Sequence, residues 1–500
     1  MLLEVAMSIA IAGPDAAQKA PSPSTTAPVP AASMERVRAE ELLALLAAGD
    51  DPGIDDFVDR HRFSPETPEM EPAAATKQRL RVLARQSGGV DVSEWHPQGK
   101  AIFYEGLTRK GAVPVEGALF FRDGKILGID LQRNLQKRPD DAPAWPLKAT
   151  TVDQAIRDIR AEIDWRAKAE RFSGAVLIAH RGKAVLADSW GLARRGPDIP
   201  NTNATLHHTA SATKMLTSAA IATLIDRGKL SLDTTVAKAV PDMAAAPDAT
   251  TVTIADLLGH RVDYGEYFDE LKASPKLRSS RRLTNVLALI KDRKPQRAPD
   301  GKVAYSNANY LILAAAVEAA SGQPFFDYVR AHIIEPLGMK HLTYGEVDRR
   351  PANAAVGWVK DEVSDPFAIG PWKSNDHMFV GSYRGGAAGG AWSTAEDMWK
   401  LVDSIAAGKL IRPATLSAML QDRRRVGPTL GSALGFMYRG GDKLAYFGHA
   451  GGGGNAGMSS SAFISPDREW AVVVLSNFSS PSGEMLGGQL LDFLAKLPRE

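Results

Sequence analysis

The residues that could do chemistry in this sequence begin with Ser211 and Lys214, which lie three positions apart. Small and apolar residues follow them at helical spacing, and Gly228 supplies a stop signal. This pattern predicts a buried helix with Ser211 in its first turn. Residues three apart share a helix face, so the hydroxyl and the amine can meet. Serine becomes a nucleophile when a base takes its proton, and lysine can be that base only when burial or a second cation lowers its pKa.

A Ser-x-x-Lys pair by itself is a weak signal, because a chain of this length should contain roughly one or two matches by chance. Two further motifs strengthen it. Tyr305-x-Asn307 follows a Pro/Asp/Gly turn and precedes an apolar helix, and His449-x-Gly451 lies in the β-rich C-terminal part. The three motifs together supply a nucleophile, candidate bases and hydrogen-bond donors, which is what acyl transfer requires.

In order and rough spacing, these motifs resemble those of the serine β-lactamase and penicillin-binding-protein superfamily. The resemblance is to its class C-like branch of esterases, D-amino-acid-releasing peptidases and β-lactamases. Accessory stretches similar to those of the family lie at residues 227–233, 335–339 and 389–397. The resemblance covers residues 150–500. It implies an α/β (α+β) β-lactamase/transpeptidase-like fold, in which helices flank an antiparallel sheet and a helical subdomain is added.

The resemblance also implies a role for each motif residue. Ser211 would attack the substrate carbonyl, and Lys214 would accept its proton directly or through Tyr305. Tyrosine ionises near pH 10 in water, so Tyr305 could be a base only beside a cation such as Lys214. Which of the two is the general base stays open. Asn307 would hydrogen-bond Lys214 and the acyl side of the substrate.

The strand motif departs from the family and bears on the substrate. Many relatives have Lys-Thr-Gly where this chain has His449, Ala450 and Gly451. A histidine is mostly neutral at pH 7 and alanine has no hydroxyl, so a substrate carboxylate would be held less well.

The resemblance also implies an oxyanion hole, which the backbone N–H groups of Ser211 and of Gly452 would form.

The sequence therefore predicts a serine hydrolase that forms an acyl-enzyme, in the first place a carboxylesterase. A D-amino-acid-specific peptidase or amidase and a β-lactamase are the enzymatic alternatives. The non-enzymatic alternative is a catalytically silent module that binds peptidoglycan or a protein partner. The complete set of motif residues argues against the silent module.

Other motifs do not support different chemistry. His207 and His208 lack a third metal ligand at a sensible spacing, so they are interpreted as structural. Residues 452–457 match Gly-x-Gly-x-x-Gly but do not open a helix after a strand, which argues against a dinucleotide site. There is no Gly-x-Ser-x-Gly elbow and no His-Glu-x-x-His helix. No cofactor or metal is expected.

Composition limits the partners. The net charge is +2, and no basic run is interleaved with aromatic residues, so nucleic acid is not an expected partner. The sequence has no run of 18 consecutive apolar residues, so no integral membrane segment is expected. The chain has no cysteine, which excludes disulfides and thiol catalysis. The expected partner is a small-molecule ester or amide substrate, and the oligomeric state stays open.

Four segments are predicted along the chain. Residues 1–33 are apolar and then rich in Pro, Ser, Thr and Ala, which suggests a secretory signal and tether and hence a periplasmic or secreted protein. The acidic Glu4 and the absence of basic residues at the N-terminus argue against a signal peptide, so a cytoplasmic location is the alternative. Residues 34–137 are expected to form a small α+β domain of unknown role, residues 138–149 a proline-containing linker, and residues 150–500 the hydrolase domain.

In the small domain, Asp123 and Gly124 are expected to form a hairpin turn, and Glu94 and His96 are interpreted as surface residues. Helices are expected there at residues 35–47, 55–62 and 75–86, and strands at 101–105, 117–122 and 125–131.

In the hydrolase domain, hairpins at both ends of the chain with helices between them predict one antiparallel sheet, with the site in the helical insertion. Residues 257–265 depart from the corresponding loop of relatives, which bears on pocket shape. Strands are expected at residues 173–180, 184–190, 444–448, 460–465 and 470–477, and helices at 152–166, 281–291, 311–320 and 484–497, with one more ending at 257–260.

Overall fold

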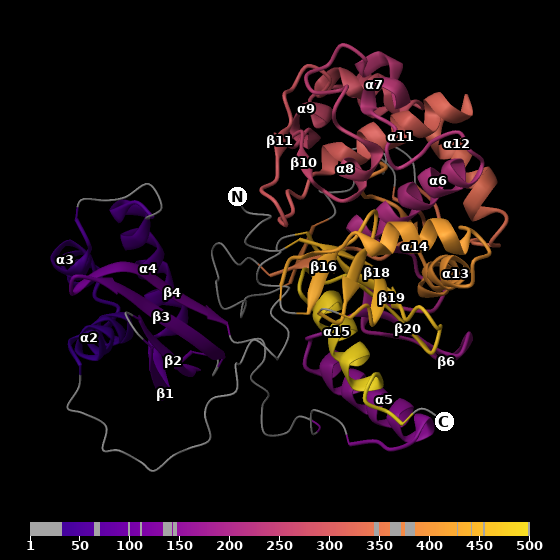
Figure 1. The fold of residues 1–500 in the computed structure, drawn as a ribbon. Helices are drawn as coiled ribbons and strands as arrows, with labels where there is room; N and C mark the ends of the chain where they lie inside the picture. Colours follow the sequence, from indigo (N-terminus) through magenta and orange to yellow (C-terminus); the bar gives the residue numbers. More distant parts are fainter. Residues whose placement is uncertain are drawn as a thin grey trace. The chain divides into compact units, whose positions relative to one another are not determined.

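The computed structural model describes residues 33–64, 71–98, 101–110, 113–133, 143, 148–344, 350–360, 372–375, 386–427, 429–441, 443–453 and 456–498. These residues divide into two compact units (Figure 1). The smaller unit lies within residues 19–142 and 360–373, and the larger within 143–359 and 374–500. Most of the expected linker, residues 138–149, and all but the last of residues 1–33 fall outside the described residues.

The smaller unit has the predicted α+β composition. Its sheet is antiparallel with the order β1-β2-β3-β4, and its helices and strands share one apolar core in which Phe57 and Tyr104 are fully buried. The elements are α2 (Met34–Ala48), α3 (Asp51–His61), α4 (Ala73–Ser87), β1 (Val90–Gln98), β2 (Ala101–Thr108), β3 (Pro114–Arg122) and β4 (Lys125–Arg133).

Two details of this unit differ from expectation. Helix α3 begins four residues early, because the Asp50 carboxylate accepts a hydrogen bond from the Gly53 N–H and caps the helix there. Strand β1 was not predicted. It is an edge strand rich in polar residues, and a hydrophobic alternation is weak in such strands. Glu94 and His96 lie on β1 and are exposed, as predicted.

The predicted hairpin turn between β3 and β4 is confirmed. Asp123 and Gly124 both have positive φ, 50° and 71°, and β3 pairs with β4 in antiparallel register up to Arg122 and Lys125. Positive φ at both central positions matches the twist of the flanking strands, which is why an Asp-Gly pair favours this turn.

The larger unit is built on an eight-stranded sheet with the order β15-β16-β17-β18-β19-β20-β5-β6. Strand β20 pairs antiparallel with β5, so the sheet joins both ends of this unit as predicted (Figure 1). The strands are β5 (Gly174–His180), β6 (Lys183–Trp190), β15 (Arg424–Arg425), β16 (Leu430–Ser432), β17 (Met437–Arg439), β18 (Tyr446–Gly452), β19 (Ser459–Ile464) and β20 (Trp470–Ser476).

Both faces of this sheet are covered. Val472 and Val474 of β20 pack with helices α5 (Val152–Lys168) and α15 (Ser482–Leu494). Val473 and Leu475 point to the opposite face and pack in the core that holds the other helices. Side chains alternate along a strand, so a strand buried on both faces reads as the continuous apolar run of β20.

Two helices run through the core of the helical part. Helix α6 (Lys214–Asp226) and helix α11 (Asn307–Ser321) are buried through most of their length, including their first residues. The other elements of this unit are β7 (Leu192–Arg194), β8 (Ile199–Pro200), β9 (His207–His208), η2 (Ala210–Thr213), α7 (Val236–Ala239), η3 (Pro241–Met243), α8 (Ile254–Leu258), β10 (Val262–Asp263), α9 (Phe268–Lys272), α10 (Pro275–Arg278), η4 (Leu283–Leu289), β11 (Gln296–Arg297), α12 (Phe325–Val329), η5 (Arg330–Ile334), β12 (Trp358–Val359), β13 (Lys373–Ser374), β14 (Trp392–Ser393), α13 (Ala395–Ala406) and α14 (Pro413–Gln421).

The helix expected at residues 281–291 is shorter and more tightly wound than predicted. It is the 3₁₀ helix η4, whose first N–H groups, those of Leu283 and Thr284, donate to the buried carboxylate of Glu318 in α11. Residues three apart lie directly above one another in a 3₁₀ helix, so the buried side chains of Leu283 and Val286 lie on the same face of η4. The Glu318 carboxylate thus binds the N–H groups at the start of η4.

Candidate active site

The candidate nucleophile lies at the junction between two helical segments. Ser211 is in the 3₁₀ turn η2, and α6 begins at Lys214, so the predicted single helix is a 3₁₀ turn followed by an α-helix. Ala210, directly before the serine, has a φ of 46°, a left-handed conformation that is uncommon for a residue other than glycine. Ser211 is partly exposed and Lys214 is fully buried, so a substrate can reach the hydroxyl while the amine is shielded.

Distant parts of the chain hold this turn in place. The Ser460 hydroxyl of β19 donates to the Thr209 carbonyl at 2.7 Å. The Thr209 N–H donates to the Ala391 carbonyl at 2.8 Å, and the Ala391 N–H donates to the Thr213 hydroxyl at 3.2 Å. The turn is therefore fixed by the sheet on one side and by the stretch around Ala391 on the other.

Lys214 meets three oxygen atoms. Its Nζ lies 2.7 Å from Asn307 Oδ1, 2.6 Å from the Ala388 carbonyl oxygen and 3.3 Å from Ser211 Oγ. A neutral amine has two hydrogens and one lone pair. If Asn307 and Ala388 accept the two hydrogens, the lone pair faces Ser211, and the amine is oriented to accept the serine proton.

The surroundings of Lys214 also favour the neutral amine. Burial lowers the pKa of Lys214 to about 7, and the negative charge of Glu266 opposes part of this shift. An ordinary lysine has a pKa near 10.4 and is almost fully charged at neutral pH. A large fraction of Lys214 is therefore unprotonated at pH 7.

Tyr305 contacts the same serine. Its hydroxyl donates to Ser211 Oγ at 2.8 Å, and Lys214 Nζ lies 4.8 Å from the centroid of its ring. Burial raises the pKa of Tyr305 far above its ordinary value, although the hydrogen bond with Ser211 opposes the shift. Tyr305 therefore keeps its proton at neutral pH. The raised pKa of Tyr305 disfavours it as a proton acceptor, and the lowered pKa of Lys214 favours the amine in that role.

His260 packs against the ring of Tyr305. It was not predicted as part of the site. The two rings stack with centroids 4.4 Å apart, and His260 Nδ1 accepts a hydrogen bond from the Ser306 N–H at 3.1 Å. Burial and the nearby charge of Lys214 lower the pKa of His260 well below its usual value, so the ring is neutral. No sequence motif predicted this contact, and His260 was noted only as part of the loop at residues 257–265.

Gly451 of β18 lies very close to the nucleophile. A Cβ atom at this position would lie 2.4 Å from the Ser211 backbone nitrogen, so only glycine allows β18 to approach so closely. Gly452 faces the other way, and a Cβ there would meet Ser480 and Glu484 instead. The prediction that the Gly452 N–H binds the oxyanion stays a prediction.

We expect Gly451→Ala to lower kcat by at least about 10²-fold, because the new methyl group must push the nucleophile or the strand away, and a displacement near 1 Å has such an effect. Gly128→Ala is the control, since its Cβ would find nothing closer than 3.6 Å. Ester hydrolysis and circular dichroism would be measured for both variants. A fully active Gly451→Ala enzyme would contradict the close approach.

His449 lies in β18 beside Gly451, as the motif predicted, and is buried. Burial, with the charge of Lys214 adding to it, lowers the pKa of His449 to about 3. The imidazole is therefore neutral at pH 7 and does not supply the positive charge that a lysine would supply there. Its part in substrate binding stays a prediction.

Glu266 is a second residue that sequence reasoning missed. Its Oε1 accepts a hydrogen bond from Asn307 Nδ2 at 2.8 Å, while Asn307 Oδ1 accepts from Lys214. The carboxyl is thus two hydrogen bonds from the amine that touches Ser211. Much of Glu266 remains exposed to solvent. No short-range pattern links position 266 to the three motifs.

The structure offers no metal site among the residues that it describes, since no three His, Asp or Glu side chains gather in a way that could hold an ion. His207 and His208 form β9, which pairs with β14, and burial lowers their pKa values to about 4 and about 3. Within the described parts of the chain, no helix is long and apolar enough to cross a bilayer.

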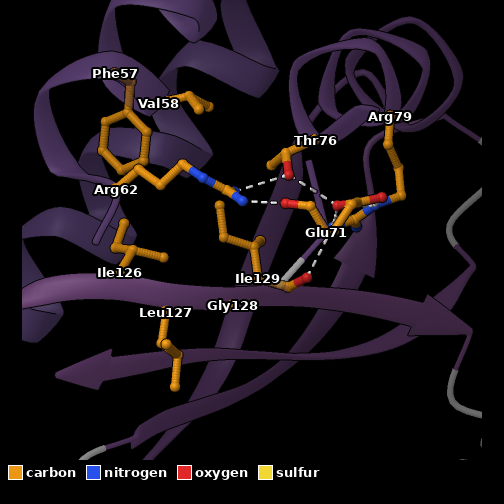
Figure 2. Close-up of a pocket in the computed structure, with 10 residues that line it drawn as sticks. All are labelled: Phe57, Val58, Arg62, Glu71, Thr76, Arg79, Ile126, Leu127, Gly128 and Ile129. Atoms are coloured by element: carbon orange, nitrogen blue, oxygen red, sulfur yellow. Dashed lines mark hydrogen bonds and ion pairs between the residues drawn. The ribbon is translucent and has the colours of Figure 1, made fainter. Parts of the chain in front are cut away.

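The smaller unit contains a cavity of about 90 Å³ (Figure 2). Arg62 donates to the Thr76 hydroxyl at 3.1 Å and to the Glu71 carbonyl, and Arg79 pairs with the Glu71 carboxylate at 2.8 Å. The charged groups that line the cavity are thus bound to one another. Its lining includes no serine or lysine, so it does not resemble the constellation around Ser211.

Comparisons with known proteins agree with this geometry. The family model described as Beta-lactamase matches residues 152–495. Esterase EstB of Burkholderia gladioli is 30% identical over 328 residues, which cover 60% of this chain and 82% of EstB. Protein flp of Staphylococcus aureus (strain MW2) is 28% identical over 185 residues, which cover 37% of each chain. The chain spans between 37% and 66% of the length of the first three curated relatives.

Solved structures show the same fold. A penicillin-binding protein from Bacillus halodurans matches with a TM-score of 0.55 and 27% identity, covering 68% of this chain and 98% of that one. D-amino acid amidase from Ochrobactrum anthropi SV3, in complex with L-phenylalanine amide, matches with a TM-score of 0.56 and 20% identity. This second match covers 69% of this chain and 98% of the amidase, and at such identity it supports the fold alone.

Proposed function

This chain belongs to the beta-lactamase family of serine hydrolases, and we propose that it is a carboxylesterase that works through an acyl-enzyme on Ser211. One observation carries the proposal: Ser211 Oγ is in contact with both the Lys214 amine, at 3.3 Å, and the Tyr305 hydroxyl, at 2.8 Å. A base and a proton donor therefore meet at one partly exposed alcohol.

In the proposed mechanism, neutral Lys214 takes the proton of Ser211 while Oγ bonds to the ester carbonyl carbon. The carbonyl oxygen becomes an oxyanion, which the backbone N–H groups of Ser211 and Gly452 would stabilise. Loss of one such donor costs about 3 to 4 kcal/mol in other enzymes. As the tetrahedral intermediate collapses, Tyr305 gives its proton to the leaving alcohol and regains one from Lys214.

Deacylation reverses these roles. Water enters where the alcohol left, Lys214 accepts one of its protons through Tyr305, and the hydroxide attacks the acyl carbonyl. The bond to Ser211 Oγ then breaks, and Oγ takes a proton from Lys214, which becomes neutral again. The chain returns to its starting state with one ester and one water converted to an acid and an alcohol.

The ester preference rests on the strand motif. A neutral His449 and the hydroxyl-free Ala450 provide no cation or hydroxyl for a substrate carboxylate, which penicillins and C-terminal peptides carry. The similarity to esterase EstB points the same way. An alcohol also leaves with less protonation than an amine, so a single neutral tyrosine is an adequate donor for an ester.

Mass spectrometry of the intact protein and of its proteolytic peptides after rapid acid quench would test the proposal, with p-nitrophenyl esters, D-alanyl amides and a chromogenic cephalosporin as separate substrates. We expect an acyl adduct on the peptide that contains Ser211, formed fastest with the esters, and none on Ser211→Ala. Faster acylation by the amides would replace the esterase with an amidase or peptidase. An active enzyme with its adduct on another residue would overturn the mechanism, and failure of a fluorophosphonate to label Ser211 would favour the silent module.

A further inference from the structure

We infer, on the basis of the proposed acyl-enzyme and its oxyanion hole, that Glu484 and Ser480 are positioning residues that hold the Gly452 N–H in that hole. Glu484 lies in the first turn of α15, and Ser480 lies just before this helix. The Ser480 hydroxyl donates to Glu484 Oε1 at 2.6 Å. No step of the proposed chemistry uses either side chain directly, so their effect on the rate must pass through the strand end that they contact.

This strand end is the last part of β18. The antiparallel register of β18 with β17 ends at Gly448, whereas its register with β19 continues to Gly452, which lies opposite Ser459. One N–H of the proposed oxyanion hole belongs to Gly452, and the other belongs to Ser211 in the turn η2. The width of the hole therefore depends on how closely the strand end and the turn are held together.

The two glycines of the strand end make close contacts on opposite sides. A Cβ atom on Gly451 would overlap the Ser211 backbone nitrogen. A Cβ atom on Gly452 would overlap Ser480 Oγ and would lie 2.5 Å from Glu484 Oε1. Successive residues of a strand face opposite sides, so the nucleophile and the Ser480–Glu484 pair enclose the strand end between them. The pair thus limits how far Gly452 can move away from the nucleophile.

The segment that begins helix α15 is itself anchored on the sheet. The Ser480 N–H donates to the carbonyl of Gly453, one residue past Gly452, at 3.2 Å. The Gly483 N–H donates to the hydroxyl of Ser459 at 2.6 Å, and Ser459 is the β19 residue opposite Gly452. The start of α15 is therefore bound to both strands at the level of the proposed oxyanion hole.

The carboxyl end of Glu484 is shielded from solvent. Its Oε2 is buried, although the residue as a whole is half-buried. Burial raises the pKa of Glu484 to about 7, while the hydrogen bond from Ser480 opposes part of this shift. Below pH 7 the carboxyl is thus mostly neutral, and a glutamine would offer the same oxygen to the Ser480 hydroxyl. That hydroxyl donates to Oε1 in either protonation state, so the contact does not depend on the charge.

A matched ester and thionoester, p-nitrophenyl acetate and p-nitrophenyl thionoacetate, would test the inference. Sulfur is larger than oxygen and accepts weaker hydrogen bonds, so an oxyanion hole with well-placed donors favours the ester. The ratio of the two kcat/KM values would be measured at pH 6, where Glu484 is mostly neutral. Part of Lys214 is protonated at this pH, which slows both substrates alike and cancels in the ratio.

Glu484→Ala should lower kcat/KM for the ester about 10- to 10²-fold, because a displaced donor keeps part of its effect and complete loss of one costs about 10²- to 10³-fold. The ester-to-thionoester ratio should fall about tenfold, since the thionoester gains less from the hole. Glu484→Gln should keep both quantities near their wild-type values, because its amide oxygen can accept from Ser480. A general loss of structure would instead slow both substrates equally.

Two further variants complete the test. Ser480→Ala removes the same hydrogen bond without a change in α15 and should also lower the ratio, so the inference stays testable if urea unfolding shows that Glu484→Ala does not fold. Asp492→Ala is the matched control. It removes a carboxylate from the same helix, one that pairs with Arg439 at 3.3 Å, and should leave the ratio unchanged.

The outcomes separate this inference from the proposed function. A wild-type ratio in either folded variant, Glu484→Ala or Ser480→Ala, would overturn the positioning role and leave the acyl-enzyme on Ser211 intact. A Glu484→Gln enzyme as slow as Glu484→Ala would also overturn it, because the contact with Ser480 would then not be what matters. A wild type that hydrolyses neither substrate and does not react with a fluorophosphonate would overturn the proposed function itself.

Discussion

Ser211→Ala and Lys214→Met are each expected to lower kcat for a p-nitrophenyl ester by about 10⁴-fold or more, and the double variant should be no slower than the slower single variant. Without Oγ no acyl bond can form. Without the amine, no group in contact with Ser211 can accept its proton at neutral pH, since burial raises the pKa of Tyr305. Because the two groups act in one step, removal of either leaves nothing for the other to do.

The controls separate catalysis from stability. Methionine keeps most of the lysine volume in a fully buried position, and urea unfolding would show whether the variant remains folded. Lys229→Met changes an exposed lysine just beyond the end of the same helix and should retain full activity. If the two single effects multiplied in the double variant, Ser211 and Lys214 would not act in one step and the mechanism would be wrong.

The sequence predicted those parts of the site that have a residue-type signature. Ser211 and Lys214 share a helical repeat, and Tyr305 and Asn307 precede a long apolar helix, so spacing and the family resemblance placed all four. The sheet was predicted from the hairpins at both ends of the larger unit, with helices between them. The structure brings these residues together through tertiary contacts that the motifs do not encode.

The parts that were missed depend on backbone atoms and distant packing. Ala388 contributes a carbonyl oxygen to Lys214, and any residue type has such an oxygen. His260 and Glu266 lie on either side of β10, and their contacts with Tyr305 and Asn307 exist only once the chain has folded. Local patterns also failed at η4, where a 3₁₀ helix that starts against the buried carboxylate of Glu318 replaces the expected longer helix.

The pH profile distinguishes the two bases that the sequence left open. With Lys214 as the base, the active form is the unprotonated amine. Its pKa is about 7, so kcat/KM of the wild type should fall as pH decreases through 7 and then decline about tenfold per pH unit. At pH values well above 7 the amine is already neutral and the rate should level off.

Tyr305→Phe should keep this acidic limb while it lowers kcat by about 10² to 10⁴-fold, the range for loss of a positioned proton donor. The limb stays because Lys214 still supplies it, and the rate falls because the leaving alcohol loses its donor. The effect should be larger for a poor leaving group, such as methanol, than for p-nitrophenol, which leaves without protonation.

Tyr310→Phe is the matched control for this test. The Tyr310 ring also lies against Lys214, with its centroid 5.2 Å from Nζ, but its hydroxyl interacts with Ser218 instead of Ser211. It should lose far less activity, with the same dependence on the leaving group as the wild type. If Tyr305→Phe abolished the acidic limb and slowed both leaving groups equally, Tyr305 would be the base. The role of Lys214 would then be to stabilise an ionised Tyr305. The raised pKa of the buried Tyr305 hydroxyl argues against this state.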